Sequence, residues 1–211
     1  MSDRGLRLED LSVSLGDRAL VRLTASVAPG EVLTVMAPSG AGKSTLLAAI
    51  TGTLDPSFTL SGQVFLDGRD VTRLPTRDRR IGILFQDTLL FPHLSVAGNL
   101  AFALPPRLPD RALRIEQALA EASLSGFGPR DPATLSGGEK ARVALMRTLL
   151  AEPKALLLDE PFSRLDAGLR SQVRDFVLRT AATRSLPVIL VTHDLEDAEA
   201  AGGRILPPLV T

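Results

Sequence analysis

One segment of the chain restricts the possible folds more than any other. An apolar run at residues 31–36 leads into Ala37-Pro38-Ser39-Gly40-Ala41-Gly42-Lys43-Ser44-Thr45, and helix-forming residues follow as far as Ile50. A strand, a glycine-containing loop and a helix in this order, with Gly-Lys-Ser-Thr at the helix start, are typical of a phosphate-binding loop. A loop of this kind needs a parallel α/β sheet beneath it, so the segment predicts both a fold class and an anionic ligand.

The residue types in this loop fit the chemistry of phosphate binding. Gly40 and Gly42 allow consecutive backbone N–H groups to converge on phosphate oxygens, at the positive end of the following helix. We expect Lys43 to reach the β- and γ-phosphates and the Ser44 hydroxyl to hold Mg²⁺. The strict pattern begins with Gly, whereas this chain has Ala37 there. If that position requires φ > 0, alanine costs about 1–2 kcal/mol of strain.

Composition excludes several other classes of protein. The 211 residues carry 24 basic and 24 acidic side chains, so no strong global field favours nucleic acid. The chain has no Cys, which excludes disulfides, thiolate metal sites and a Cys nucleophile. The longest apolar runs, such as residues 155–158 and 188–191, are strand-sized, whereas a membrane-spanning helix needs about 20 residues.

The periodicity of apolar residues predicts a parallel α/β core with a helical insertion. Strand patterns occupy 6–15, 20–27, 31–36, 63–66, 81–85, 155–158 and 187–192. Helical patterns occupy 43–50, 100–104, 112–122, 140–150 and 166–182. The helices of the insertion fall between about residues 88 and 152.

A second candidate site element is the apolar run Ala155-Leu156-Leu157-Leu158, which ends in Asp159-Glu160. Parallel α/β sheets bind ligands at the carboxyl ends of their strands, where these two carboxylates are expected. Asp159 would orient Mg²⁺ or its water, and Glu160 would act as general base on the attacking water. A strand that ends in two acidic residues is a weak indication of a site by itself. Together with the phosphate loop it becomes a strong one.

A third element is Leu135-Ser136-Gly137-Gly138-Glu139, which opens the helix predicted at 140–150. Ser136 is typical of an N-cap, and the two glycines leave the first amides of the helix accessible. The segment is therefore either an ordinary capped helix or a second anion site at a helix N-terminus. A second phosphate site on one chain would serve the nucleotide of a neighbouring molecule.

Five motifs in this order and spacing resemble those of an ATP-binding-cassette (ABC) ATPase. They are the loop at 37–45, Gln86 after Ile81-Gly82-Ile83-Leu84-Phe85, the LSGGE signature at 135–139, Asp159-Glu160, and His193 in Val191-Thr192-His193-Asp194. Ser163-Arg164-Leu165-Asp166 resembles the family loop that follows the second carboxylate. The stretches 83–87, 91–96 and 131–135, together with Arg164, are most similar to the importer ATPases, in the YnjD-like subgroup near the thiamine and iron importers.

The resemblance implies an ATPase that binds ATP and Mg²⁺ between two copies of the chain arranged head to tail. Lys43, Ser44, Thr45, Gln86, Asp159, Glu160 and His193 of one copy would face Ser136 to Glu139 of the other. Glu160, His193 and Gln86 would be catalytic, Ser44, Gln86 and Asp159 would contact Mg²⁺, and Asp166 would contact the second copy. The partners implied are membrane permease subunits and a substrate-binding protein, at the cytoplasmic face of the inner membrane, with no nucleic acid.

The implied fold is one ABC ATPase domain, 1–211, with a P-loop NTPase core, a mostly parallel sheet, an N-terminal antiparallel β subdomain and an inserted helical subdomain. Residues 1–30 and about 58–75 would form the antiparallel part, and 31–57, 76–87 and 153–211 the nucleotide-binding core. Residues 88–152 would form the helical subdomain with the signature. Residues 91–94 would line the groove for a membrane subunit, or pack locally. After His193 we expect no room for the regulatory β domain of many importer ATPases.

Two other functions are compatible with these motifs. One is a soluble ABC ATPase that acts on nucleic acid or on complex assembly, although the chain lacks the coiled coil, second cassette or basic extension common there. The other is a nucleotide-gated binding module with little turnover, against which Glu160 and His193 argue. The transported substrate is not encoded in the chain.

The aromatic composition points to one further position. The chain has eight Phe but neither Tyr nor Trp. In this family an aromatic residue after the first strand commonly stacks on adenine, and the alignment of residues 11–17 places Leu15 there. We therefore expect Leu15 to contact the base and to select it loosely.

Overall fold

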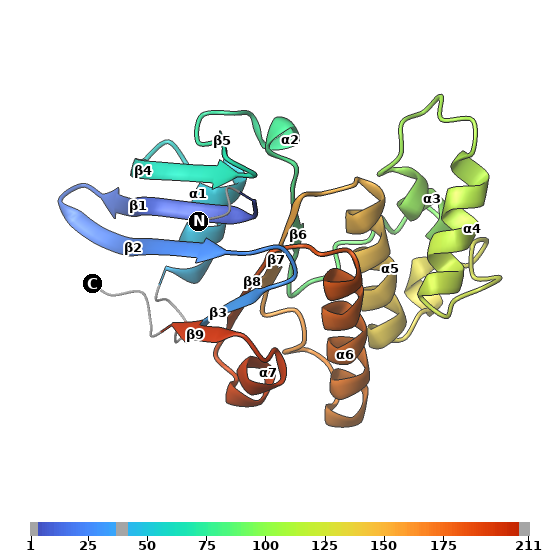
Figure 1. The fold of residues 1–211 in the computed structure, drawn as a ribbon. Coiled ribbons are helices and arrows are strands. Elements are labelled where there is room, and N and C mark those ends of the chain that lie inside the picture. Colours follow the sequence, from blue (N-terminus) through green and yellow to red (C-terminus); the bar gives the residue numbers. More distant parts are fainter. Residues whose placement is uncertain (1–3, 37–41, 207–211) are drawn as a thin grey trace. The chain divides into compact units, whose positions relative to one another are not determined.

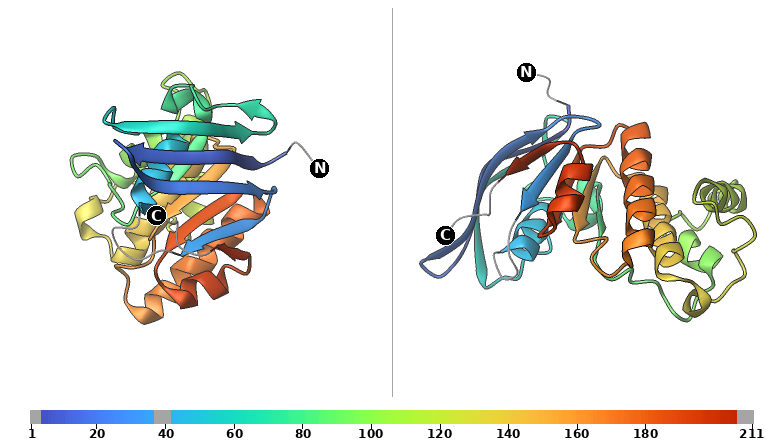
Figure 2. Two further views of the ribbon diagram at one scale, coloured as in Figure 1. Left: turned by 90° about the vertical axis from the view of Figure 1, so that its left-hand side faces the viewer. Right: turned by 90° about the horizontal axis from the view of Figure 1, so that it is seen from below.

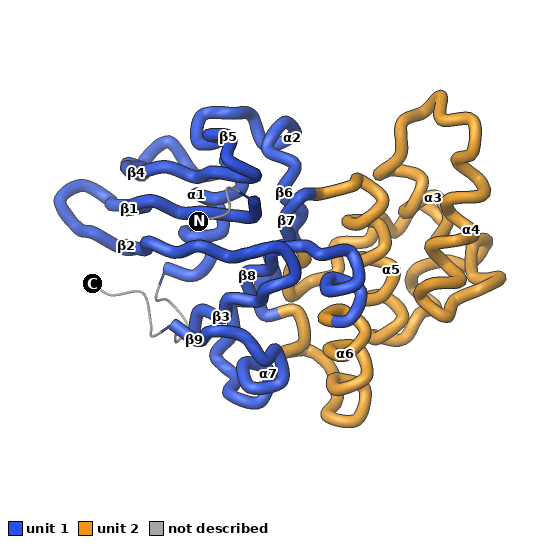
Figure 3. The backbone as a smooth tube through the Cα atoms, in the orientation of Figure 1, with its two compact units in different colours: residues 1–83, 154–160, 179–211 blue, residues 84–153, 161–178 orange. Residues whose placement is uncertain are grey.

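A computed structural model of the chain describes residues 4–36 and 42–206, which form two compact units (Figures 1 and 3). The first unit comprises residues 1–83, 154–160 and 179–211, and the second comprises residues 84–153 and 161–178. The first unit holds the β-sheets and the second is mainly helical, so the chain is of mixed α/β class.

The first unit contains an antiparallel sheet in the strand order β2-β1-β4-β5. Its strands are β1 (Leu6–Leu15), β2 (Arg18–Val27), β4 (Phe58–Leu66) and β5 (Arg69–Asp70). In β1 the alternation of apolar residues breaks between Leu8 and Leu11, because Leu8 pairs with Ala25 and Leu11 with Leu23. This bulge places Asp10 at φ 45° and allows both leucines to be buried in the core.

The second sheet has the order β6-β7-β8-β3-β9. Its strands are β3 (Val32–Met36), β6 (Ile81–Leu84), β7 (Ala155–Asp159), β8 (Val188–Thr192) and β9 (Arg204–Leu206). The pairs β7–β8, β8–β3 and β3–β9 are parallel. Because these strands run in one direction, the carboxyl ends of β3, β7 and β8 lie at one edge of the sheet.

Helix α1 (Lys43–Thr51) lies between the two sheets of the first unit (Figure 2). Leu46, Leu47 and Ile50 are buried in one core together with residues of both sheets. The helix ends at Gly52, where φ is 76°. The unit also contains the short helices α2 (Thr76–Arg79) and α7 (Leu195–Ala200).

Three helices of the second unit pack on one another. They are α3 (Val96–Ala101), α4 (Arg111–Glu121) and α5 (Gly137–Leu150), with the 3₁₀ turn η1 (Pro132–Thr134) before α5. Helix α6 (Ala167–Thr183) begins in this unit and ends in the first. The helix predicted at 100–104 is wrong in position, because Ser95 caps α3 by accepting a hydrogen bond from the Gly98 N–H. Helix α3 therefore begins earlier and ends before Pro105.

Candidate active site

The carboxyl ends of β7 and β8 place two predicted catalytic residues on neighbouring strands. Glu160 follows β7 directly and His193 follows β8 directly. Asp159 pairs with Val191 in the sheet, and the Glu160 N–H donates to the Val191 carbonyl oxygen at 2.9 Å. Parallel pairing thus brings together two residues that lie 33 positions apart in the sequence.

Lys43 is delivered to the same place by the first turn of α1. Gly42 precedes it with φ 81°, a conformation that favours glycine. A Cβ atom on Gly42 would lie 2.9 Å from Val21 Cγ2 and 3.0 Å from the Leu20 carbonyl oxygen. The close approach of β2 is therefore a second reason for glycine at position 42, immediately before the helix.

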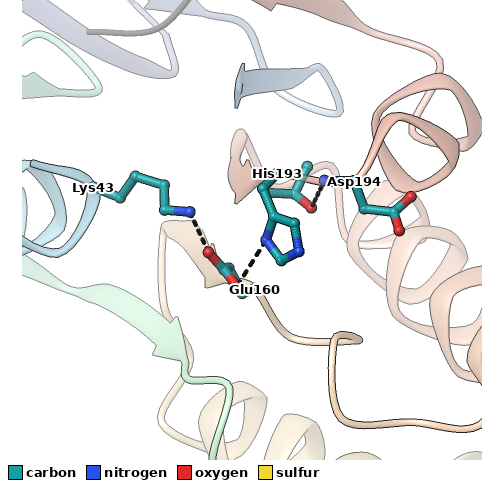
Figure 4. Close-up of polar contacts among 5 residues, drawn as sticks. Lys43, Glu160, His193 and Asp194 are labelled. Atoms are coloured by element: carbon teal, nitrogen blue, oxygen red, sulfur yellow. Dashed lines mark hydrogen bonds and ion pairs between the residues drawn. The ribbon is translucent and has the colours of Figure 1, made fainter. Parts of the chain in front are cut away.

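The Glu160 carboxylate lies between the Lys43 ammonium and the His193 imidazole (Figure 4). Lys43 Nζ donates to Glu160 Oε1, and His193 Nδ1 lies 3.0 Å from Glu160 Oε2. The side chains of Lys43 and Glu160 are 8% and 14% exposed, whereas that of His193 is 52% exposed. The cluster is thus a buried ion pair with one side open to solvent through the imidazole.

Electrostatics separate the two neighbouring carboxylates. Burial acts to raise the pKa of Glu160, but hydrogen bonds from Lys43 and His193 and their positive charges lower the pKa overall. The pKa of Asp159 is raised, first by burial and then by the charge of Glu160, against an opposing effect of Lys43. Glu160 is therefore held as the carboxylate. The ionised form of Asp159 is destabilised, and a cation beside it would stabilise that form.

The backbone of Glu160 adopts a left-handed conformation with φ 45°. A residue other than glycine in this region costs about 1–2 kcal/mol, and such strain tends to occur at functional positions. The conformation turns the chain sharply at the end of β7 and directs the carboxylate toward Lys43.

The remaining predicted nucleotide contacts of the first unit fall into two groups. Ser44 is exposed and Thr45 is half-buried on the first turn of α1, whereas Ala37, Pro38, Ser39, Gly40 and Ala41 lie outside the described residues. Leu15 ends β1 opposite Arg18, and its side chain is 48% exposed. An apolar side chain so placed has area available for a ligand.

The signature segment begins α5 in the second unit. The Ser136 hydroxyl accepts from the Glu139 N–H at 3.4 Å, and Glu139 Oε2 accepts from the Ser136 N–H at 2.7 Å. This capping box confirms Ser136 as an N-cap. A Cβ on Gly138 would lie 2.7 Å from Leu169 Cδ1, and one on Gly137 would lie 3.2 Å from Leu165 Cδ2. A Cβ on Gly138 would therefore displace Leu169, whereas one on Gly137 would require only a small shift of the Leu165 side chain.

Gln86 and Asp166 also belong to the second unit, where both are exposed. Gln86 follows β6, and Asp166 immediately precedes α6. Between the segments that carry them, Arg164 forms an exposed ion pair with Asp87.

The comparisons with known proteins decide the family. The model of the family described as ABC transporter matches residues 20–163. The chain belongs to the ABC transporter family. This ABC protein is 48% identical over 198 residues to the uncharacterized ABC transporter ATP-binding protein YnjD of Escherichia coli K12, covering 92% of the chain and 91% of the relative.

Other relatives of this ABC protein are named as importer subunits. The thiamine import ATP-binding protein ThiQ of Jannaschia is 42% identical over 95% of the chain and 87% of its own length. A sulfate/thiosulfate import protein, CysA of Gloeobacter violaceus, is 43% identical over 90% of the chain, which spans 56% of that relative. The solved structure of CbiO1 from Clostridium perfringens matches with a TM-score of 0.85 and 28% identity, over 98% of the chain and 85% of CbiO1.

These matches confirm the predicted family, the P-loop fold of ABC ATPases and the enzyme class. The protein is an ABC ATPase of the importer type, and its family binds and hydrolyses ATP. Within residues 4–36 and 42–206, no helix combines the length and apolar character needed to cross a bilayer.

Sequence reasoning missed two polar centres. In the second unit, buried Asn99 accepts from the Phe91 N–H at 2.7 Å and donates to the carbonyls of Phe91, Leu94 and Ser95. Arg147 donates to the carbonyls of Thr88 and Leu89, so these two side chains fix residues 88–95. Asn99 could have been found from the sequence, because it is a polar residue on the apolar face of a short helix.

The other missed centre is Arg79 in the first unit, which is 5% exposed. Its guanidinium donates to the carbonyls of Ala49 and Ile50 at the end of α1 and to those of Leu74 and Thr72. In the sequence Arg79 stands among several arginines and has no distinguishing pattern.

Proposed function

We propose that the protein is the ATP-hydrolysing subunit of a bacterial ABC importer. Two copies form a head-to-tail dimer, closure of the dimer on ATP drives separate permease subunits, and a substrate-binding protein supplies the cargo. The chain then sits at the cytoplasmic face of the inner membrane. The similarity to thiamine and sulfate/thiosulfate import proteins, and to CbiO1, described as part of the transporter complex CbiONQ, supports this proposal.

The observation that carries the catalytic part is the convergence of Lys43, Glu160 and His193 at the ends of three elements. Lys43 and the loop at 37–42 bind the phosphates of ATP, and Thr45 supports them from the first turn of α1. Glu160, which Lys43 and His193 hold as the carboxylate, accepts a proton from the attacking water. His193 and Gln86 contact the transferred phosphoryl group, where negative charge builds.

Oxygen donors near this cluster fit Mg²⁺, which prefers one or two protein ligands together with phosphates and water. In the first unit the Ser44 hydroxyl and the Asp159 carboxylate provide such donors, and the family resemblance adds the amide oxygen of Gln86. Burial beside Glu160 raises the pKa of Asp159, which supports a cation at this position. When bound, Mg²⁺ neutralises charge on the β- and γ-phosphates.

The start of α5 provides the second half of the composite site. Ser136, Gly137, Gly138 and Glu139 contact the ATP held by the other copy, where the N-terminus of a 14-residue helix attracts an anion. Asp166 lies at the dimer contact. The subdomain boundaries that follow from the resemblance belong to the same proposal.

Residues 91–94 form the proposed contact with a permease subunit. Pro92 and His93 are exposed. Phe102 contacts Phe91 with tilted rings, 4.7 Å between centroids, and is 67% exposed. Asn99 and Arg147 hold this segment in one conformation and so preserve the shape of the contact.

The catalytic proposal is tested by Glu160→Gln, with Glu116→Gln on the exposed face of α4 as the matched control. Loss of a general base lowers the rate by about a hundredfold or more. We expect this loss in steady-state phosphate release for Glu160→Gln and an unchanged rate for Glu116→Gln. Hydrolysis that continues unchanged in Glu160→Gln would remove Glu160 from the role of base.

The transport proposal is tested by affinity purification of the tagged chain from detergent-solubilised membranes of its own cell. We expect integral membrane subunits to be recovered in stoichiometric amounts. Recovery of the chain in a soluble assembly without membrane subunits would instead favour a non-transport ABC ATPase.

A further inference from the structure

We propose that Glu160 has a second role, as an internal substitute for phosphate on Lys43 and His193. Its carboxylate contacts both of these side chains, so nucleotide binds by exchange and not by simple addition. The inference rests on the proposed function, because that function assigns Lys43 and His193 to the phosphates.

The contacts of the Glu160 carboxylate carry this inference. One oxygen accepts from Lys43 and the other lies 3.0 Å from His193 Nδ1, so each oxygen has a different donor group. Figure 4 shows the carboxylate between the two side chains, as a bound anion would lie. The Lys43 and Glu160 side chains are largely withdrawn from water, which strengthens their attraction.

Backbone contacts fix the positions of both Glu160 and Lys43. Glu160 is fixed by its N–H bond to Val191 and by its left-handed φ of 45°. Lys43 is fixed at the start of α1 by the close approach of Gly42 to β2. Backbone contacts thus fix the positions from which the two side chains meet.

Exchange lowers the net affinity for any phosphate ligand by the free energy of the contact that is broken. A ligand without phosphate leaves the Lys43–Glu160 pair intact, so its affinity is not reduced by the free energy of breaking the pair. The pair therefore lowers the affinity only of ligands whose phosphate displaces the Glu160 carboxylate from Lys43.

The decisive experiment is a titration with ADP in EDTA, monitored by calorimetry, on the full chain and two variants. Glu160→Gln removes the charge, and Glu160→Asp keeps the charge but shortens the side chain so that it withdraws from Lys43. We expect both variants to bind ADP about tenfold more tightly than the wild type, because a charge-assisted hydrogen bond no longer competes. Adenosine, which has no phosphate, should bind all three chains equally.

The aspartate variant distinguishes exchange from general repulsion. If the negative charge of Glu160 merely repelled phosphate, Glu160→Asp would bind ADP as weakly as the wild type, and that result would overturn the proposal. Equal ADP affinity in all three chains would overturn it too. If ADP does not bind the wild type and Lys43→Ala changes nothing, the proposed nucleotide site itself is wrong.

A crystal structure of the wild type with ADP provides a test that needs no variant. We expect the Lys43 ammonium on a phosphate oxygen and outside hydrogen-bonding distance of Glu160. A structure in which ADP is bound while Lys43 and Glu160 stay paired would overturn the proposal.

Discussion

At the scale of single residues, the Glu160 carboxylate contacts both Lys43 and His193. All three residues were expected at a phosphate site. The bond between Lys43 and Glu160 joins residues 117 positions apart, and no local pattern encodes that distance in space. The left-handed φ of Glu160 could not be predicted from the sequence either, because Glu has no preference for that region.

Leu15 carries a prediction at this scale. Its side chain is 48% exposed at the end of β1 and has no aromatic face to stack on a base. Aromatic stacking is worth about 1–3 kcal/mol, so we expect GTP to compete with ATP within about tenfold. Leu15→Tyr should tighten ATP binding by a similar free energy, measured by competition with a fluorescent nucleotide.

The matched control for that prediction is Leu113→Tyr, at a leucine of α4 that is 59% exposed. This control should leave ATP and GTP affinities unchanged. A wild-type preference for ATP of a hundredfold or more would contradict the placement of Leu15 at the base.

At the scale of elements, segments with a continuous apolar pattern were predictable, and segments without one were not. Strands β3, β7 and β8 and helix α5 are found close to their predicted positions, because their apolar patterns are continuous. The two-residue strand β5 and the three-residue strand β9 exist only through pairing with β4 and β3. Elements that depend on tertiary partners leave no local periodicity to detect.

The end of α1 depends on buried Arg79, which satisfies carbonyls at the end of the helix and in the following loop. Arg79→Met should lower the free energy of unfolding by about 2–4 kcal/mol, because buried carbonyls lose their donors. Urea denaturation monitored by circular dichroism measures this change. Arg77→Met, at a side chain that is 86% exposed, should have almost no effect. Equal stability of the two variants would contradict a capping role for Arg79.

The capping box of α5 predicts a dependence on pH. The hydrogen bond from the Ser136 N–H holds the pKa of Glu139 below its ordinary value of 4.5. A lowered carboxyl pKa contributes stability above pH 4.5 that is lost as the pH falls through the folded-state pKa. Glu139→Gln, which keeps an acceptor oxygen, lacks this contribution.

The difference in urea midpoint between wild type and Glu139→Gln should therefore be largest near pH 7 and should shrink below pH 4.5. A difference that stays constant from pH 7 to pH 4 would show that the charge of Glu139 adds nothing to the cap.

At the scale of the whole molecule, the order of motifs was decisive for the fold. The antiparallel and parallel sheets of the first unit and the helices of the second agree with the predicted fold class. No pattern within one chain tests whether the phosphate loop and the signature serve the same nucleotide.

Mixing two inactive variants tests the head-to-tail dimer. Glu160→Gln disables the base, and Ser136→Glu places a negative charge at the signature, with Ser136→Ala as the control for loss of the cap. In mixed dimers one of the two composite sites keeps both halves intact. Random pairing in an equal mixture should therefore restore about a quarter of the wild-type ATPase rate. A mixture no more active than its components would contradict composite sites.

The half-exposed end of β1 has a practical consequence for spectroscopy. Because the chain contains neither Tyr nor Trp, it has almost no absorbance or emission of its own near 280 nm or beyond. A Leu15→Trp chain would carry a single indole, placed where the base is proposed to bind. Quenching of that one emission would then report the arrival of the base in real time, with no background from the rest of the protein.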